Sequence, residues 1–386
     1  MLFPKVPHAV LYALLFFLIL ILSLSHLSWD ADSPGAAGRV LRVLTISGDG
    51  SRNPFSSSKL SDSDPDHQPN IYHALRRHSI NNTVTIVPIN NGMLPYAMNM
   101  ICTLKNNTDF DPTKLVFWTL GEEVGALLRE QGLTTFHDPD LWGTSQDIGS
   151  TYGKTFQKMM NQRPKFWVHV LETGLDMLFL DTDLIFFQSP LKLISPDVDL
   201  AIASDGREYF GGLDTKGNPF KDPGSKGDMM PPVCAGTFWV KSGHDTLNLF
   251  RIMQNVMEDD PSTKLLKEKY NFHDDQRAFD TLLNDGRANL VDPLPMGIEE
   301  GMLEGRKPEK ARLKVQMWDQ VRVVSGHLFL ELDKQYEEKL RDLEAMGGER
   351  WLIHLNWNAG ATPKHEGAKK KGIWMLDEDG ECLLKK

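Results

Sequence analysis

The sequence predicts an α/β fold with a doubly wound, mostly parallel sheet and flanking helices. Segments of strand character alternate with segments of helical character, and turn residues such as Asn90-Asn91-Gly92 separate them. Gly132 and Gly174 close two of the expected helices. This alternation is typical of a parallel sheet, because neighbouring parallel strands need a crossover connection that is usually a helix.

The expected strands are short runs of aliphatic, β-branched or aromatic residues. In chain order they are residues 83–89, 115–119, 176–180, 184–187, 199–203, 236–241 and 351–355. The expected helices are residues 71–78, 93–104, 122–131, 151–158, 165–173, 246–258 and 276–283. Pro164 is expected to start a new helix, since proline is tolerated in the first helical turn but not in the interior. Asp274 or Asp275 is expected to cap the last helix.

Two carboxylates interrupt an apolar stretch, where Asp181 and Asp183 stand between the runs Met177–Leu180 and Leu184–Phe187. Charges in such surroundings are costly unless compensated, and divalent cations such as Mn²⁺ or Mg²⁺ take oxygen ligands. If the strand stays extended, the two acids share one face. If the chain turns, they lie at the carboxyl end of the strand, where α/β sheets bind ligands. We therefore expect a metal site, and the structural alternative is a surface turn with two solvated aspartates.

Composition and charge bound the class of protein. The 386 residues are 41% hydrophobic and carry a net charge of −10, and no run of Lys and Arg forms a nucleic-acid patch, so we expect no nucleic-acid partner. The three cysteines, Cys102, Cys234 and Cys382, match no zinc motif and allow at most one disulfide. Cys102 and Cys234 have apolar neighbours and are expected to be buried small residues.

The N-terminus predicts membrane insertion. Residues 9–27 are largely apolar and follow Lys5, which indicates an uncleaved signal anchor, and a signal peptide cleaved after Ser25 is the alternative. Sequons at Asn81 and Asn106 agree with a lumenal domain, so we expect a single-pass type II protein of the Golgi or ER membrane. The expected divisions are a cytosolic tail, the anchor, a largely disordered stem and the folded domain, at residues 1–8, 9–27, 28–82 and 83–386.

Short motifs follow one another in a characteristic order from about Thr83 to about Asp379. They are Pro88-Ile89-Asn90-Asn91-Gly92, Asn99 with Cys102, Arg163 with Lys165, His169 and Glu172-x-Gly174, Leu180-Asp181-Thr182-Asp183, Ser204-Asp205, Asp275-Gln276, His354-Leu355-Asn356-Trp357 and Gly372-Ile373-Trp374. In this order and spacing the chain resembles the nucleotide-diphospho-sugar transferase domain family, which are glycosyltransferases of the GT-A fold. It departs from that family where Cys234-Ala235-Gly236 stands in place of an Asn and Thr119-Leu120-Gly121 in place of an acid.

The resemblance implies a nucleotide-sugar donor, expected to be a UDP-sugar, and a glycan or glycoprotein acceptor. It implies that His354 joins Asp181 and Asp183 as ligands of Mn²⁺ or Mg²⁺. Asp275 and Gln276 are expected near the anomeric carbon, where an oxygen atom stabilises oxocarbenium character, and the transfer is expected to retain configuration. The implied donor-binding residues are Pro88, Asn90, Asn91, Arg163, Lys165, Asp181, Asp205 and Lys364.

Each role has a structural alternative: a strand-capping histidine for His354, a solvated lysine for Lys364, an N-cap for Asp275, and pairing with acids for Arg163 and Lys165.

Three other protein functions fit parts of this sequence pattern. A haloacid-dehalogenase-like phosphatase also carries D-x-D after a hydrophobic strand, but usually on the first strand of its domain. A glycoside hydrolase needs two carboxylates across a cleft and no metal motif. A catalytically inert lumenal sugar-binding protein would not need the acids and the histidine intact.

Overall fold

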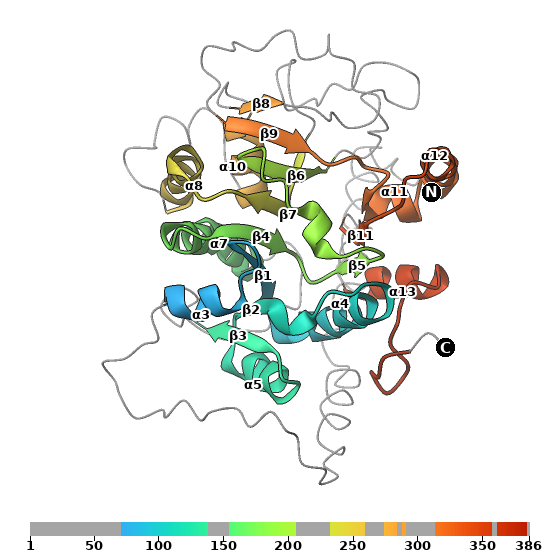
Figure 1. Ribbon diagram of the computed structural model, residues 1–386. Coiled ribbons are helices and arrows are strands. Elements are labelled where there is room, and N and C mark those ends of the chain that lie inside the picture. Colours follow the sequence, from blue (N-terminus) through green and yellow to red (C-terminus); the bar gives the residue numbers. More distant parts are fainter. Residues whose placement is uncertain are drawn as a thin grey trace, which may run out of the picture. The chain divides into compact units, whose positions relative to one another are not determined.

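The computed structural model describes residues 71–137, 154–205, 232–258, 274–283, 288–290, 313–356 and 361–383. An eight-stranded sheet runs through this part of the chain (Figure 1). In order across the sheet the strands are β3 (Thr134–His137), β2 (Leu115–Thr119), β1 (Thr83–Ile89), β4 (Asp176–Leu180), β7 (Val233–Val240), β6 (Leu200–Ser204), β9 (Leu313–Met317) and β8 (Ala288–Leu290). β7 runs antiparallel to β4 and β6, and the other neighbours are parallel. The predicted α/β fold with a mostly parallel sheet is confirmed, and β7 makes the sheet mixed.

The chain winds outward from β1 and then returns across it. It passes from β1 through α4 (Leu94–Asn107) to β2, through α5 (Glu122–Glu130) to β3, and back through α7 (Lys154–Glu172) to β4. Right-handed crossovers in two opposite directions place helices on both faces of a sheet, which is what the doubly wound prediction expects of this strand order. The strand order reverses between β1 and β4, so the carboxyl ends of these two strands form the switch point at which open α/β sheets bind ligands.

An aromatic core supports β4 from one face of the sheet. Trp167 of α7 meets Phe179 of β4, Phe238 of β7 and Phe250 of α8 (His244–Met257) edge-on, with ring centroids 5.1 to 5.5 Å apart. These four side chains are almost fully buried, and Phe279 of α10 (Asp275–Leu282) packs against the same group. Removing one such aromatic side chain costs about 3–5 kcal/mol, so this core fixes the strand that leads into Asp181.

One continuous helix, α7, replaces the two helices that we expected on either side of Pro164. Proline cannot donate the hydrogen bond to the carbonyl four residues earlier, and this change costs about 3 kcal/mol or more inside a helix. Phe166 and Trp167, two and three residues after Pro164, are fully buried. Their packing offsets the lost hydrogen bond, which the local sequence does not show.

A smaller sheet, in the order β10 (Val323–Ser325), β11 (Leu352–His354) and β5 (Leu184–Phe186), follows the metal motif. β5 pairs with β11 instead of continuing β4, so the chain turns at Asp181-Thr182-Asp183. Of the two geometries expected for these acids, the turn is the one observed. A second core covers this sheet with side chains from α4, α11 (Gly326–Leu330), α12 (Asp333–Ala345) and α13 (Ala361–Lys370).

The helix expected at residues 71–78 is present as α3 (Ile71–His78). Leu75 belongs to the main core, so the folded part begins before Thr83, the boundary that the sequence predicted. The expected anchor at residues 9–27 lies outside the described residues. Among the helices of the described part, none is long and apolar enough to cross a membrane.

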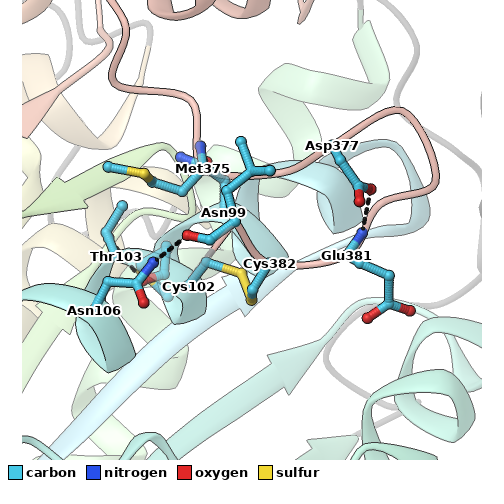
Figure 2. The surroundings of a disulfide bond; sticks show 10 residues. Asn99, Cys102, Thr103, Asn106, Met375, Asp377, Glu381 and Cys382 are labelled. Atoms are coloured by element: carbon cyan, nitrogen blue, oxygen red, sulfur yellow. Dashed lines mark hydrogen bonds between the residues drawn. A yellow bond between two sulfur atoms is a disulfide. The ribbon is translucent and has the colours of Figure 1, made fainter. Parts of the chain in front are cut away.

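A disulfide joins Cys102 of α4 to Cys382 near the C-terminus (Figure 2). Cys102 is buried as predicted, but it is half of a disulfide and not a plain core residue. Two hydrogen bonds accompany the link, because Met375 N–H donates to Asn99 Oδ1 at 2.6 Å and Asn106 Nδ2 donates to the Leu383 carbonyl at 2.8 Å. The segment that follows α13 is therefore fastened along α4.

Replacing Cys102 and Cys382 together by Ser should lower the free energy of unfolding by about 2–5 kcal/mol, since the bond closes a very long loop of the unfolded chain. The two residues are 280 positions apart. Urea unfolding measures the difference. A reductant should destabilise the wild type equally and leave the double variant unchanged, and equal midpoints for both proteins would show that the bond does not stabilise the fold.

Candidate functional site

Three predicted metal ligands meet at the carboxyl end of β4. Asp181 directly follows β4, Asp183 lies in the turn after it, and His354 ends β11. His354 Nε2 lies 3.2 Å from Asp183 Oδ1 and 3.5 Å from Asp181 Oδ2. One ligand atom from each residue falls within 4.8 Å of the others, so the three could hold a metal ion. The bond from Leu355 N–H to the Asp183 carbonyl, at 3.0 Å, ties the two segments together.

Gly236 leaves the space that this cluster fills. A Cβ atom on Gly236 would overlap Asp181 Oδ2 and lie 2.6 Å from His354 Cε1. The Gly236 carbonyl also accepts a hydrogen bond from Asp181 N–H at 2.7 Å, which places the strand β7 directly against the cluster. Because Gly236 has no side chain, two carboxylates and an imidazole fit beside it. This donor set suits Mn²⁺ or Mg²⁺. The residues present therefore fit the metal that the sequence predicted.

Positive groups balance the two acids. Lys364 Nζ of α13 lies 2.5 Å from Asp183 Oδ2, and Asp183 is almost fully buried. Burial alone would raise the pKa of Asp183, but Lys364 and His354 outweigh it and hold that pKa well below its usual range. Burial would likewise lower the pKa of His354, and nearby groups that include Asp183 raise it instead. Asp183 is therefore an anion at neutral pH, as a metal ligand must be.

Gly236→Ala should weaken Mn²⁺ binding by about ten- to a hundredfold or more, because the new methyl group displaces Asp181 and His354. Isothermal titration calorimetry with Mn²⁺ measures the affinity. Gly243→Ala is the matched control, since its Cβ would come no closer than 3.7 Å to Thr246 Oγ1. Equal affinities for the two variants would mean that this glycine does not shape the site.

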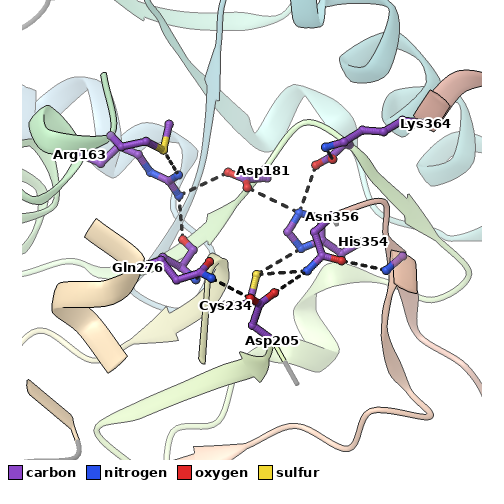
Figure 3. Close-up of polar contacts among 12 residues, drawn as sticks. Arg163, Asp181, Asp205, Cys234, Gln276, His354, Asn356 and Lys364 are labelled. Carbon is purple, nitrogen blue, oxygen red and sulfur yellow. Dashed lines mark hydrogen bonds and ion pairs between the residues drawn. The ribbon is translucent and has the colours of Figure 1, made fainter. Parts of the chain in front are cut away.

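A buried arginine links the candidate metal ligands Asp181, Asp183 and His354 to α10 (Figure 3). Arg163 of α7 donates to the Ala235 carbonyl at 2.7 Å, and its guanidinium lies 3.4 Å from Asp181 Oδ1 and 3.1 Å from Asp275 Oδ2. The guanidinium also lies over the ring of Phe179, at 4.7 Å from its centroid. Burial raises the pKa of Asp275 to about 7, although Arg163 opposes this change. Of the alternatives for Arg163, the structure favours pairing with acids, and both of these acids belong to the site.

Asp274, not Asp275, caps helix α10. The Asp274 side chain accepts a hydrogen bond from Arg277 N–H at 2.7 Å, whereas Asp275 is the first helical residue. The sequence left the cap open between these two positions. The capping alternative for Asp275 is therefore excluded, and its carboxylate points to Arg163 instead.

Two side-chain amides hold Asp205. Gln276 Nε2 donates to Asp205 Oδ2 at 2.8 Å, and Asn356 Nδ2 donates to Asp205 Oδ1 at 3.0 Å. The other end of the Gln276 amide accepts from Ala235 N–H at 3.3 Å, so Gln276 spans β7 and Asp205. The structure thus places Asp205 and Gln276 in the same site as the three candidate metal ligands. Asn356, to which the sequence analysis assigned no role, also belongs to this site.

The remaining predicted residues divide between the site and its surroundings. Asn90 directly follows β1, which runs parallel to β4, so it lies at the same sheet edge as Asp181. Its side chain accepts a hydrogen bond from Met93 N–H at 3.0 Å. Asn91 donates to Glu123 at 2.8 Å, and Pro88 lies within β1. Lys165 is not part of the site. It pairs with Glu258 at 3.8 Å, because residues two apart on a helix point in nearly opposite directions.

Comparisons with known proteins point to one family. Residues 112–366 match the family model described as nucleotide-diphospho-sugar transferase. The beta-arabinofuranosyltransferase RAY1 of Arabidopsis thaliana is 23% identical over 301 residues, which cover 77% of this chain and 48% of that protein. The chain therefore spans about half the length of this curated relative.

Solved glycosyltransferase structures are also similar. The mouse xyloside xylosyltransferase 1 structure is 14% identical, covers 72% of this chain and 98% of its own, and has a TM-score of 0.38. The galactosyltransferase LgtC, solved with donor and acceptor sugar analogues, is 12% identical, covers 76% of this chain and 96% of its own, and also has a TM-score of 0.38.

Proposed function

Since the chain belongs to the nucleotide-diphospho-sugar transferase family, we propose that it is a metal-dependent glycosyltransferase that moves a sugar from a UDP-sugar to a glycan or glycoprotein. The observation that carries this proposal is the cluster of Asp181, Asp183 and His354 at the carboxyl end of β4. A nucleotide-sugar donor presents a diphosphate there, and two carboxylates with an imidazole suit the cation that binds it.

Asp181, Asp183 and His354 are the proposed ligands of Mn²⁺ or Mg²⁺, which supplies positive charge for the departing diphosphate. Lys364 already lies 2.5 Å from Asp183 Oδ2, so it brings a second positive charge to the same place. In this proposal Lys364 binds a phosphate oxygen as a point charge. In this proposal the nucleotide part of the donor lies beside Asn90, which directly follows β1 at the neighbouring strand end.

The sugar lies, in this proposal, over Asp205, Gln276 and the pair Arg163–Asp275. Asp205 is held by two amides and is therefore fixed in orientation before any ligand arrives. Asp275 and Gln276 stabilise positive charge that develops at the anomeric carbon. We propose that configuration is retained and that the departing phosphate oxygen accepts the proton of the acceptor hydroxyl.

A donor screen tests the proposed function. The purified full chain, in detergent and with Mn²⁺, is incubated with a panel of nucleotide sugars, and the release of free nucleotide is measured. The panel includes UDP-arabinofuranose, because one relative is an arabinofuranosyltransferase. One donor should be consumed with Mn²⁺ and not with EDTA. Binding of sugar without consumption of any donor would favour the inert sugar-binding protein, and hydrolysis of simple phosphate esters would favour the phosphatase.

The location of the chain is also a proposal. We expect residues 1–8 in the cytosol and the folded domain in the lumen of the Golgi or ER, anchored by residues 9–27. The Cys102–Cys382 disulfide supports this, since disulfides persist in oxidising compartments. In sealed microsomes, added protease should leave the domain intact, and a glycosidase should reduce its mass once detergent has opened the vesicles. Digestion of the domain without detergent would refute this topology.

A further inference from the structure

The imidazole of His354 is held from both of its nitrogen atoms (Figure 3). Nε2 faces the two aspartates, at 3.2 Å from Asp183 Oδ1 and 3.5 Å from Asp181 Oδ2. On the opposite side, Nδ1 lies 3.5 Å from the sulfur atom of Cys234 on β7, within hydrogen-bond distance for sulfur. Cys234 is 2% exposed, so this contact is shielded from bulk solvent.

A second contact holds the thiol itself. Asn356 Nδ2 lies 3.8 Å from Cys234 Sγ and donates to Asp205 Oδ1 at 3.0 Å. The oxygen of the same amide accepts from Gly326 N–H at 2.8 Å, which identifies the amide end that faces the sulfur atom. Cys234 thus lies between His354, one of the candidate metal ligands, and Asn356, which holds Asp205.

We infer that Cys234 is a positioning residue for His354, and that its thiol fixes the ring orientation in which Nε2 is offered to the metal. The inference rests on the proposed metal centre. A neutral imidazole that binds a metal through Nε2 carries its hydrogen atom on Nδ1, and a partner for that N–H fixes both the ring and the tautomer. The sulfur atom of Cys234 is placed to accept it.

A thiol suits this place because it can both donate and accept a hydrogen bond. When Nε2 carries the hydrogen atom, the S–H of Cys234 can donate to Nδ1. When Nδ1 carries it, the sulfur atom can accept. The simpler explanation is that Cys234 is only a small buried residue, as the sequence predicted. The two explanations differ in what they expect from alanine, valine and serine at this position.

The test compares three variants by their affinity for Mn²⁺ alone, measured by isothermal titration calorimetry on the full chain. Cys234→Ala and Cys234→Val remove the hydrogen-bonding group, and Val also fills the space. Both should bind Mn²⁺ about ten- to a hundredfold more weakly, which is the usual effect of losing the partner of a metal-bound histidine. Cys234→Ser keeps a group that donates and accepts, and should stay within a few-fold of the wild type.

Thr237→Val is the matched control on the same strand. Thr237 is fully buried and its hydroxyl has no hydrogen-bond partner within the described part of the chain, so its loss should leave Mn²⁺ affinity unchanged. Ala and Val variants that bind Mn²⁺ as tightly as the wild type would overturn the inference, and so would a Ser variant as weak as Ala. Failure of the wild type to bind Mn²⁺ would instead overturn the proposed metal centre.

Discussion

Asp183→Asn should abolish sugar transfer while leaving the chain folded. The amide keeps the shape of the side chain but supplies no negative charge for a divalent cation, and we expect turnover to fall by about a thousandfold or more. Donor consumption with saturating Mn²⁺ measures the loss, and a melting curve checks the fold. EDTA should reproduce the defect in the wild type, and added Mn²⁺ should restore only the wild type.

Asparagine is the better substitution at this position because of Lys364. The ammonium of Lys364 donates to the buried carboxylate of Asp183, and the Asn amide keeps an oxygen that can accept this hydrogen bond. Alanine keeps none, and removing one partner of a buried pair altogether costs about 3–5 kcal/mol. Asp183→Ala therefore loses stability as well as activity, although repulsion between the two acids alone suggests the opposite. Asp176→Asn is the matched control at the other end of β4. It can still accept from Ser242 N–H, and its activity should be normal.

Asp275→Asn should lower kcat by about a hundred- to a thousandfold while the KM for the donor changes little. This pattern marks an interaction made mainly in the transition state. Asp275 is 2% exposed and lies 3.1 Å from Arg163 Nε, beside the cluster that would hold the diphosphate. Steady-state kinetics on the donor that the screen identifies give both constants.

Asp274→Asn provides the control for this substitution. Asn caps a helix about as well as Asp, so the change should affect neither the melting temperature nor kcat. If Asp275→Asn lowers the melting temperature and leaves kcat intact, the pair with Arg163 is structural. If it raises KM as much as it lowers kcat/KM, Asp275 binds the donor in the ground state.

The pH dependence of kcat gives an independent test of Asp275. Burial raises its pKa to about 7, and the proposed role requires the anion. Turnover of the wild type should therefore rise as the pH increases through about 7. Asp275→Asn has no such group, so its residual activity should lack this step. The same step in the variant would assign the titration to another residue.

Local sequence patterns predicted the elements on which the site is built. The strands β1 and β2 have the expected bounds, since runs of β-branched and aromatic residues leave little alternative. The two aspartates also follow from pattern alone, because charge inside an apolar stretch demands compensation. His354 follows only from the family resemblance. It reaches the cluster because β11 pairs with β5, and no local signal reports such a long-range pairing.

Other features could be recognised only from the three-dimensional structure. The role of Gly236 depends on the space between Asp181 and His354, and the three cysteines allowed three pairings of which the structure shows one. The sequence analysis missed helix α12, because the helix is rich in charged residues. Its buried residues Tyr336, Leu340 and Leu343 belong to the core that covers the three-stranded sheet, which the sequence did not predict. Lys165 could be excluded only once the structure had shown that α7 is continuous through Pro164, since Arg163 and Lys165 cannot face one site from a single helix.

The most direct test of the proposed metal centre is anomalous diffraction from crystals of the full chain grown with Mn²⁺ and UDP. The account predicts one strong manganese peak in contact with Asp181, Asp183 and His354, with the diphosphate of UDP completing the coordination. Crystals of the Asp183→Asn variant should lack that peak. A protein that consumes its donor with Mn²⁺ but shows no manganese at these three residues would contradict the account.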